Sequence, residues 1–104
     1  MDVTRLAEAM AAYRSAYLLS TGGDGTIKAV TVDPRATADG LEIDRPGRGT
    51  AANVATNPRV TVLFWPLEPK GHTLIVDGTA NGDADRLTVH ATAAVLHRPA
   101  APAP

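Results

Sequence analysis

A short basic loop is the strongest candidate for chemistry in this sequence. Residues 47–50 (Gly-Arg-Gly-Thr) lie where an expected strand gives way to an expected helix, and Arg45 stands just before them. Free backbone N–H groups at a helix start, the positive end of the helix dipole and guanidinium groups all attract anions. The glycines also let the backbone approach a phosphate closely. The loop therefore predicts an anion site, with these contacts as candidates: Arg45, Arg48, Gly49 and Thr50. The alternative is an ordinary glycine turn with solvated arginines.

Two residues elsewhere could serve the same kind of site. Lys28 alternates with Val30 and Val32 along an expected strand, so its side chain starts from a face that is otherwise apolar. Such a lysine either extends into solvent or meets an anion. Trp65, beside Phe64, could stack on a ring, and it could equally fill a core that is poor in aromatic residues.

Other chemistries find little support. Cysteine is absent, which excludes disulfides, thiolate nucleophiles and cysteine-ligated metals. His90 and His97 are seven residues apart in an expected strand and would point to opposite faces, and His72 forms no ligand spacing with either. No serine lies in the context of a catalytic nucleophile. The sequence predicts neither a metal site nor hydrolytic machinery.

Length and charge limit the organisation and the partners. At 104 residues the chain has the size of one domain, which we expect to span residues 1–97, followed by a disordered Ala/Pro tail at 98–104. Ten basic and eleven acidic residues leave a formal net charge of −1, so neither nucleic acid nor an anionic membrane is an expected partner. Residues 1–17 contain no apolar run of the kind a signal peptide needs. A cytoplasmic location follows as an expectation.

The hydrophobic pattern predicts a mainly β protein. Apolar residues at three- and four-residue steps indicate a first helix near residues 3–13, which Asp2 or Thr4 could cap. A short second helix is expected at about 50–56. Residues 51–56 have a helical composition, and Asn57 and Pro58 stop the helix there. Short alternating segments joined by tight turns favour an antiparallel barrel or sandwich. The six expected strands cover residues 17–21, 26–33, 41–44, 60–65, 73–80 and 86–96.

Several local sequences together resemble a known family. They are the segment 17–21 (Tyr-Leu-Leu-Ser-Thr) with its glycine turn, the stretch 53–60 (Asn-Val-Ala-Thr-Asn-Pro-Arg-Val), the pair Phe64-Trp65, and the segment 76–80 (Val-Asp-Gly-Thr-Ala). The chain resembles the pyridoxamine 5′-phosphate oxidase-like family of FMN-binding split barrels over residues 4 to 97. The stretch 53–60 is the most specific match, since it sets a helix end, a turn and a strand start at once.

The resemblance implies a fold, a cofactor and an assembly. It implies a six-stranded antiparallel split barrel with an N-terminal helix and a short helix between the third and fourth strands. Members of the family are homodimers that hold flavin mononucleotide (FMN) in a groove between subunits. Basic residues of the second strand and of the loop before the middle helix hold its phosphate, which by resemblance assigns that role to Lys28 and Arg48.

One departure from the family bears on the cofactor. Members usually carry a lysine three residues before the asparagine that opens the stretch 53–60, and here that residue is Thr50. Either Arg45 and Arg48 replace that lysine, or the groove takes another cofactor such as a deazaflavin or haem, which relatives of this fold bind.

The first expectation is thus a flavin-dependent oxidoreductase acting on a small molecule that the sequence does not specify. A non-catalytic flavin, deazaflavin or haem carrier, and a dimer that has lost its cofactor, are the alternatives. A homodimer is also expected on physical grounds, because residues 60–65 are apolar on both faces and one face needs a cover.

Overall fold

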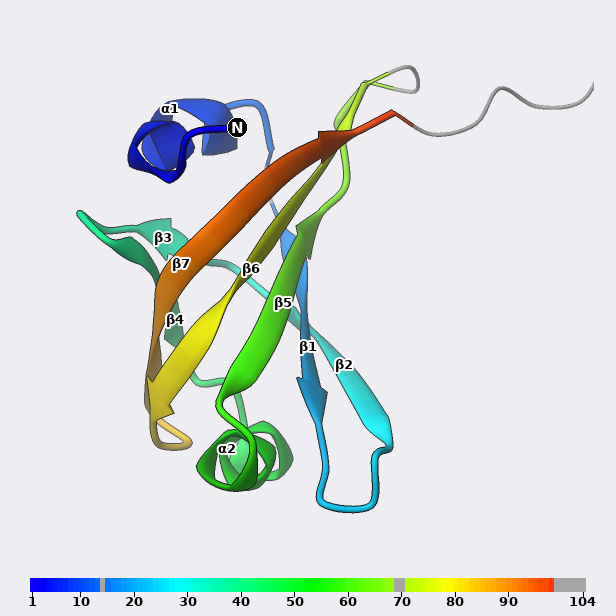
Figure 1. The fold of residues 1–104 in the computed structure, drawn as a ribbon, viewed down its shortest axis with the longest axis vertical. Helices are drawn as coiled ribbons and strands as arrows, with labels where there is room; N and C mark the ends of the chain where they lie inside the picture. Colours follow the sequence, from blue (N-terminus) through cyan, green and yellow to red (C-terminus); the bar gives the residue numbers. More distant parts are fainter. Residues whose placement is uncertain (14, 69–70, 99–104) are drawn as a thin grey trace, which may run out of the picture.

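The protein folds around one curled antiparallel sheet. The computed structural model describes residues 1–13, 15–68 and 71–98, so residues 99–104 of the predicted tail at 98–104 lie outside them. Within those ranges the strand order is β2-β1-β5-β6-β7-β4-β3 (Figure 1). The strands are β1 (Ala16–Thr21), β2 (Ile27–Val32), β3 (Arg35–Ala36), β4 (Gly40–Asp44), β5 (Arg59–Phe64), β6 (Thr73–Gly82) and β7 (Arg86–His97).

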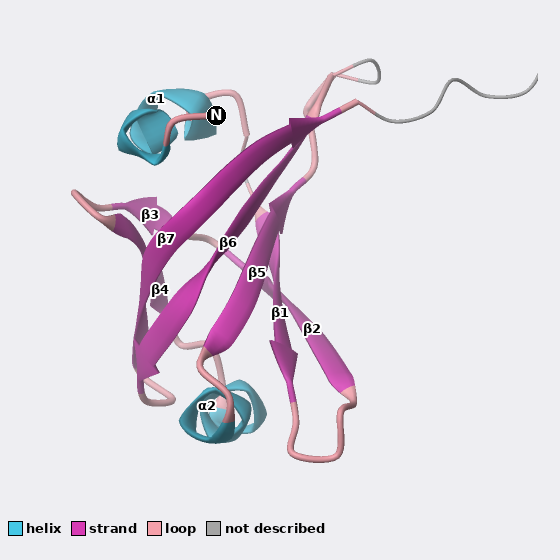
Figure 2. Ribbon diagram, viewed as in Figure 1, coloured by secondary structure: helices cyan, strands magenta, loops and turns pink. Residues whose placement is uncertain are grey.

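The sheet is a half-barrel with a helix at each end. β2 and β3 are its two edge strands, and every pairing between neighbouring strands is antiparallel. Figure 2 shows the N-terminal helices, η1 (Val3–Arg5) and α1 (Leu6–Met10), at one end and α2 (Arg48–Thr56) at the other. None of the described helices has the length and apolarity needed to cross a membrane. The predicted antiparallel split barrel is confirmed.

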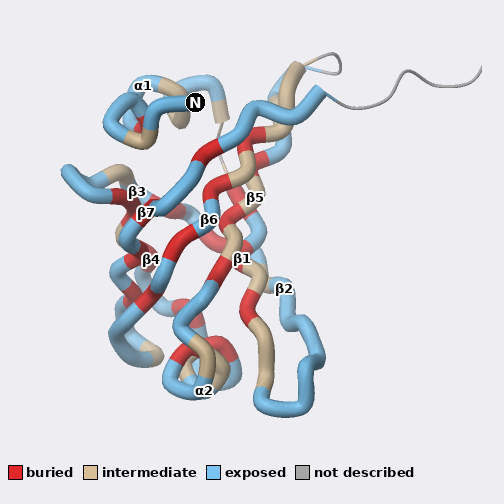
Figure 3. Tube along the Cα trace, in the orientation of Figure 1, coloured by how far each residue is buried: buried red, intermediate tan, exposed pale blue. Residues whose placement is uncertain are grey.

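Alternation along the strands separates an inner face from an outer face. In β5, Val60, Val62 and Phe64 are buried while Thr61 and Leu63 between them are only partly covered, as the sequence predicted. Buried and exposed positions alternate along several strands (Figure 3). The inner face holds Leu18, Leu74, Val76, Leu87 and Val89, none of which retains exposed surface.

The N-terminal segment closes one end of this core. The Asp2 carboxylate accepts the Thr4 N–H at 2.9 Å, the cap that the sequence predicted. Leu6 is buried, and Met10 and Tyr13 pack against the core on the same side. The Tyr13 hydroxyl donates to the His72 carbonyl at 2.6 Å, which ties this segment to the chain just before β6.

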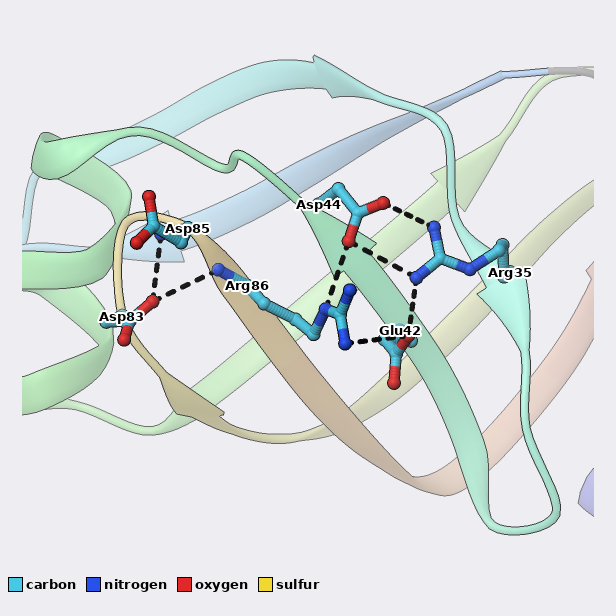
Figure 4. Close-up of polar contacts among 6 residues, drawn as sticks. All are labelled: Arg35, Glu42, Asp44, Asp83, Asp85 and Arg86. Carbon is cyan, nitrogen blue, oxygen red and sulfur yellow. Dashed lines mark hydrogen bonds and ion pairs between the residues drawn. The ribbon is translucent and has the colours of Figure 1, made fainter.

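The prediction of six strands is wrong by one, because β3 was not predicted. β3 has only two residues, too few for an alternation pattern. Ion pairs hold it beside β4: the Arg35 guanidinium contacts Glu42 and reaches Asp44 at 2.6 Å. Arg86 of β7 contacts Asp44 from the other side at 3.1 Å (Figure 4). The middle helix consequently follows the fourth strand instead of the third.

This ion-pair network makes β3 sensitive to acid. The hydrogen bonds from Arg35, and then the one from Arg86, hold the pKa of Asp44 below its usual value of 3.8. A lowered pKa in the folded state contributes stability above the unfolded value, and that contribution is lost as the pH falls through the folded value. We expect the NMR signals of Arg35 and Ala36 to shift toward unpaired values as the pH falls below 3.8. In Asp44→Asn this transition should be smaller, because only Glu42 is left to pair with Arg35; an identical transition in that variant would contradict the assignment.

Candidate functional site

The start of α2 leaves backbone donors without a side-chain cap. The helix begins at Arg48, two residues before the predicted start, because Gly47 adopts φ 96° and turns the chain into the helix. Gly47 is the N-cap residue and offers no side-chain hydrogen bond. The first N–H groups of a helix have no partner within it, so these donors and the helix dipole face outward together.

Lys28 of β2 extends over this helix start. It pairs across the sheet with the buried Ser20, so its side chain leaves from the inner side, as its alternation with Val30 and Val32 predicted. The ammonium nitrogen Nζ lies 2.9 Å from the point where a Cβ on Gly49 would stand. Any residue other than glycine at this position would push the lysine away. Lys28 and Gly49 are thus brought together from strand and helix.

Both residues line a hollow of about 390 Å³ between the β1–β2 hairpin and α2, which we call the inner hollow. Asn53 also lines it, one helical turn after Gly49, and donates to the Ser20 hydroxyl at 3.1 Å. Gly22 and Asp24 contribute from the hairpin turn. Sequence reasoning missed Asn53 as a site residue. Its four-residue step from Gly49 places both on one helix face and was the available signal.

The charges around the inner hollow are mixed. Lys28 and Arg48 make no ion pair with any described residue. Asp24 is the carboxylate of this hollow, and it accepts the Thr26 N–H at 3.0 Å. That hydrogen bond lowers the pKa of Asp24, so the carboxylate stays ionised near neutral pH. An anion here would be attracted by Lys28 and the helix start and opposed by Asp24.

The other predicted contacts do not line this hollow. Arg48 is exposed on the first turn of α2. Arg45 is also exposed, with φ 50°, and its backbone N–H donates to the Asp85 carbonyl at 2.7 Å. Thr50 is fully buried, and its hydroxyl has no hydrogen-bond partner among the described residues. A ligand in the inner hollow would not reach that hydroxyl unless α2 moved.

Trp65 is not brought to the inner hollow. It follows Phe64, whose side chain is buried on the inner face, and its ring packs against Tyr17 with centroids 4.8 Å apart. Both rings are partly exposed on the outer face, whereas Lys28 leaves from the inner side. The sheet therefore separates Trp65 from the predicted phosphate contacts within one chain.

Solved structures share this architecture. A Listeria innocua protein provisionally assigned as a pyridoxamine 5′-phosphate oxidase aligns with a TM-score of 0.72 and 14% identity over 88% of this chain and 94% of its own. The haem storage protein HutZ from Vibrio cholerae aligns with a TM-score of 0.67 and 11% identity, over 92% and 95% of the two chains. An F420 reductase aligns with a TM-score of 0.65 and 16% identity, over 91% and 98%. The fold is the split barrel of pyridoxamine 5′-phosphate oxidase-like proteins.

Sequence comparison places the chain among relatives of its own. Two uncharacterized proteins, one from Mycobacterium bovis and one from Mycobacterium tuberculosis, are each 35% identical to it over 118 aligned positions, which cover 98% of this chain and 83% of theirs. No protein-family model matches the sequence. The chain belongs to the family of these two uncharacterized mycobacterial proteins.

Proposed function

We propose that the protein is a flavin-dependent oxidoreductase that holds the phosphate of its cofactor in the inner hollow. The observation that carries the proposal is the position of Lys28, whose ammonium group lies over Gly49 at an uncapped helix start. A cation, free N–H groups and a glycine without a Cβ are the features that suit a phosphate. No described carboxylate pairs with Lys28, so its charge is available to a ligand.

The residues present fit such a group, and each has a separate task. Lys28 supplies charge, the first turn of α2 supplies backbone donors, and Arg48 adds a second cation at the rim. Asn53, fixed by its hydrogen bond to Ser20, keeps the hairpin and the helix at a constant separation. A bound flavin would supply the hydride chemistry, so no side chain of the hollow need act as an acid or base.

A second candidate is a carrier that binds a flavin, a deazaflavin or haem without turnover. The family's usual lysine is absent at Thr50, which is buried here. Two of the proteins that share the fold are described as a haem storage protein and an F420 reductase. Reduction of a bound cofactor, followed by addition of an electron acceptor, distinguishes the oxidoreductase from the carrier. Only in an oxidoreductase is the bound cofactor reoxidised at a rate set by a specific acceptor.

We also propose that the working unit is a homodimer formed through the outer face. One apolar residue from each of four neighbouring strands forms a continuous row, since Tyr17 pairs with Leu63, Leu63 with Ile75, and Ile75 with Val95. Tyr17 is 43% and Val95 51% exposed. Such a row on an open sheet face needs a cover, and a two-fold axis lets each subunit cover the other. We call these four residues the apolar row.

The dimer would also give Trp65 a place in the site. Within one chain the sheet separates Trp65 from Lys28, so the two can contact one cofactor only if they come from different subunits. Trp65 and Tyr17 stand at the end of the apolar row. Because β2 is an edge strand, a cofactor with its phosphate in the inner hollow can extend around this edge to the outer face, where the partner's Trp65 would offer an aromatic surface to the ring.

Removal of the lysine charge tests the phosphate site. We expect Lys28→Gln to weaken FMN binding by roughly tenfold to a hundredfold, the loss of one charge-assisted hydrogen bond. Riboflavin, which lacks the phosphate, should bind the parent and the variant equally. The measurement is equilibrium titration followed by flavin fluorescence. Equal FMN affinity in parent and variant would refute the phosphate site, as would an equal loss for riboflavin.

A further inference from the structure

A second hollow, of about 670 Å³, lies on the outer face of the sheet, and we call it the outer hollow. β1, β5, β6 and β7 form its floor, and Ile27 at the start of β2 forms one wall. Ile27 is 64% exposed and also borders the inner hollow, so it separates the two. The volume is within the range of sites for small organic molecules, about 300–1,000 Å³.

A β-bulge shapes the floor of the outer hollow. The register of β6 with β7 shifts between Asp77 and Gly78, which leaves Thr92 as an extra residue of β7. The Thr92 hydroxyl donates to the Asp77 carbonyl at 3.1 Å, which satisfies an oxygen at the irregularity. The Thr61 hydroxyl donates to the Asp77 carboxylate at 2.6 Å and fixes its direction. The polar side of the hollow is thereby set before any ligand arrives.

Arg59 provides a cation without a partner in the outer hollow. It opens β5, where the Asn57 side chain accepts its backbone N–H at 3.2 Å and holds the start of the strand. Among the described residues its guanidinium makes no ion pair and no hydrogen bond, although Asp77 lines the same hollow. Asp77 is instead hydrogen-bonded to Thr61. The guanidinium is free to bind an anion bidentately.

Apolar surface stands opposite this charge. Leu19 lies on the floor and Ile27 forms the wall, and both side chains are on the outer face by their register in the β1–β2 pair. A cation on one side and aliphatic side chains on the other suit a molecule with an apolar body and one charged end.

We propose that the outer hollow is a binding site for a small organic anion, with the anionic group on Arg59 and the apolar body against Leu19 and Ile27. This site is separate from the inner hollow, because Lys28 and Gly49 do not line it. It lies beside the apolar row, because Thr61 and Asp77 are each two residues from Leu63 and Ile75 on the same face, so in the proposed dimer it would border the interface. It does not depend on the presence of a flavin.

The probe for this site is 2-naphthoate, a flat apolar ring system with one carboxylate, and the matched control is the neutral 2-naphthamide. NMR titration of the full chain should shift backbone signals of β1, β5 and β6 around Leu19, Arg59 and Thr61. The amide should bind the parent protein more weakly than the acid. Shifts confined to other parts of the sheet, or equal affinity for acid and amide, would overturn the proposal.

Two substitutions with opposite expected effects locate the charge. Arg59→Gln should weaken 2-naphthoate binding by about tenfold to a hundredfold. Asp77→Asn keeps an acceptor for Thr61 but removes a negative charge, so it should strengthen binding by about twofold to fivefold. Lys28→Gln should leave 2-naphthoate affinity unchanged, which distinguishes this site from the phosphate site. Unchanged affinity in Arg59→Gln would overturn the proposal even if FMN binding behaves as expected.

Discussion

A glutamate in place of Leu63 should convert the proposed dimer to a monomer. Leu63 is in the middle of the apolar row, paired with Tyr17 on one side and Ile75 on the other. A two-fold interface repeats the substitution, so two carboxylates would be placed in an apolar contact, each at a cost of several kcal/mol unless it is paired or neutralised. Analytical ultracentrifugation at micromolar concentration should show a single species of half the parent mass.

Two further variants distinguish loss of the interface from loss of the fold. Leu63 is half-buried in the single chain, so its loss could also affect folding. Val95→Glu changes a residue of the same row that is 51% exposed, and it should dissociate the dimer while the circular dichroism spectrum stays that of the parent. Ala7→Glu adds the same charge at an exposed residue of α1, and this variant should remain dimeric. A folded, dimeric Val95→Glu protein would refute this interface.

Dissociation should also change cofactor affinity. If residues of both subunits contact one flavin, the flavin binds the dimer and stabilises it, so affinity and assembly are linked. We expect Val95→Glu to bind FMN more weakly even though Val95 lines neither hollow. Parent-like FMN affinity in a monomeric variant would place the whole site within one chain.

Local patterns were enough to predict most of the fold. The alternation of Val60, Val62 and Phe64 correctly separated the two faces of β5, because a period of two is a property of the strand itself. The position of Lys28 on the inner side followed from the same rule. β3 could not be predicted, because it has only two residues and the carboxylates that contact Arg35 are on β4, where Arg86 of the distant β7 also contacts Asp44.

Local patterns likewise predicted one part of the candidate sites and missed another. The loop at 47–50 was found from residue types alone, and the structure brings Gly49 to Lys28. Thr50 was expected to offer its hydroxyl, but the earlier start of α2 places that side chain in the interior. The outer hollow depends on the register of four strands and on one bulge at Asp77 and Gly78. No local pattern encodes that register, so Arg59 drew no attention in the sequence.

Replacement of Gly49 by alanine should raise stability and lower FMN affinity at the same time. Gly49 is in α2 with no strained φ, and alanine in a helix is favoured over glycine by about 0.5–1 kcal/mol. This corresponds to a rise in melting temperature of roughly 2–8 °C. The new Cβ would stand 2.9 Å from Lys28 Nζ, so the flexible lysine must leave its place over the helix start. We expect FMN affinity to fall by about tenfold, the loss of one charge-assisted contact.

A double-mutant cycle shows whether the lysine is the cause. If Gly49→Ala acts by displacing Lys28, then it should weaken FMN binding in the parent and have no further effect in Lys28→Gln, so the two losses will not add. If the new methyl group instead obstructs the phosphate directly, the losses will add and riboflavin will be unaffected. Thermal unfolding of the same proteins should show the stabilisation in both backgrounds, because it comes from the helix backbone and not from the lysine. A loss of stability in both backgrounds, where displacement of Lys28 cannot be the common cause, would mean that α2 is not helical at this residue, and the inner hollow would then lack the uncapped helix start on which the phosphate site depends.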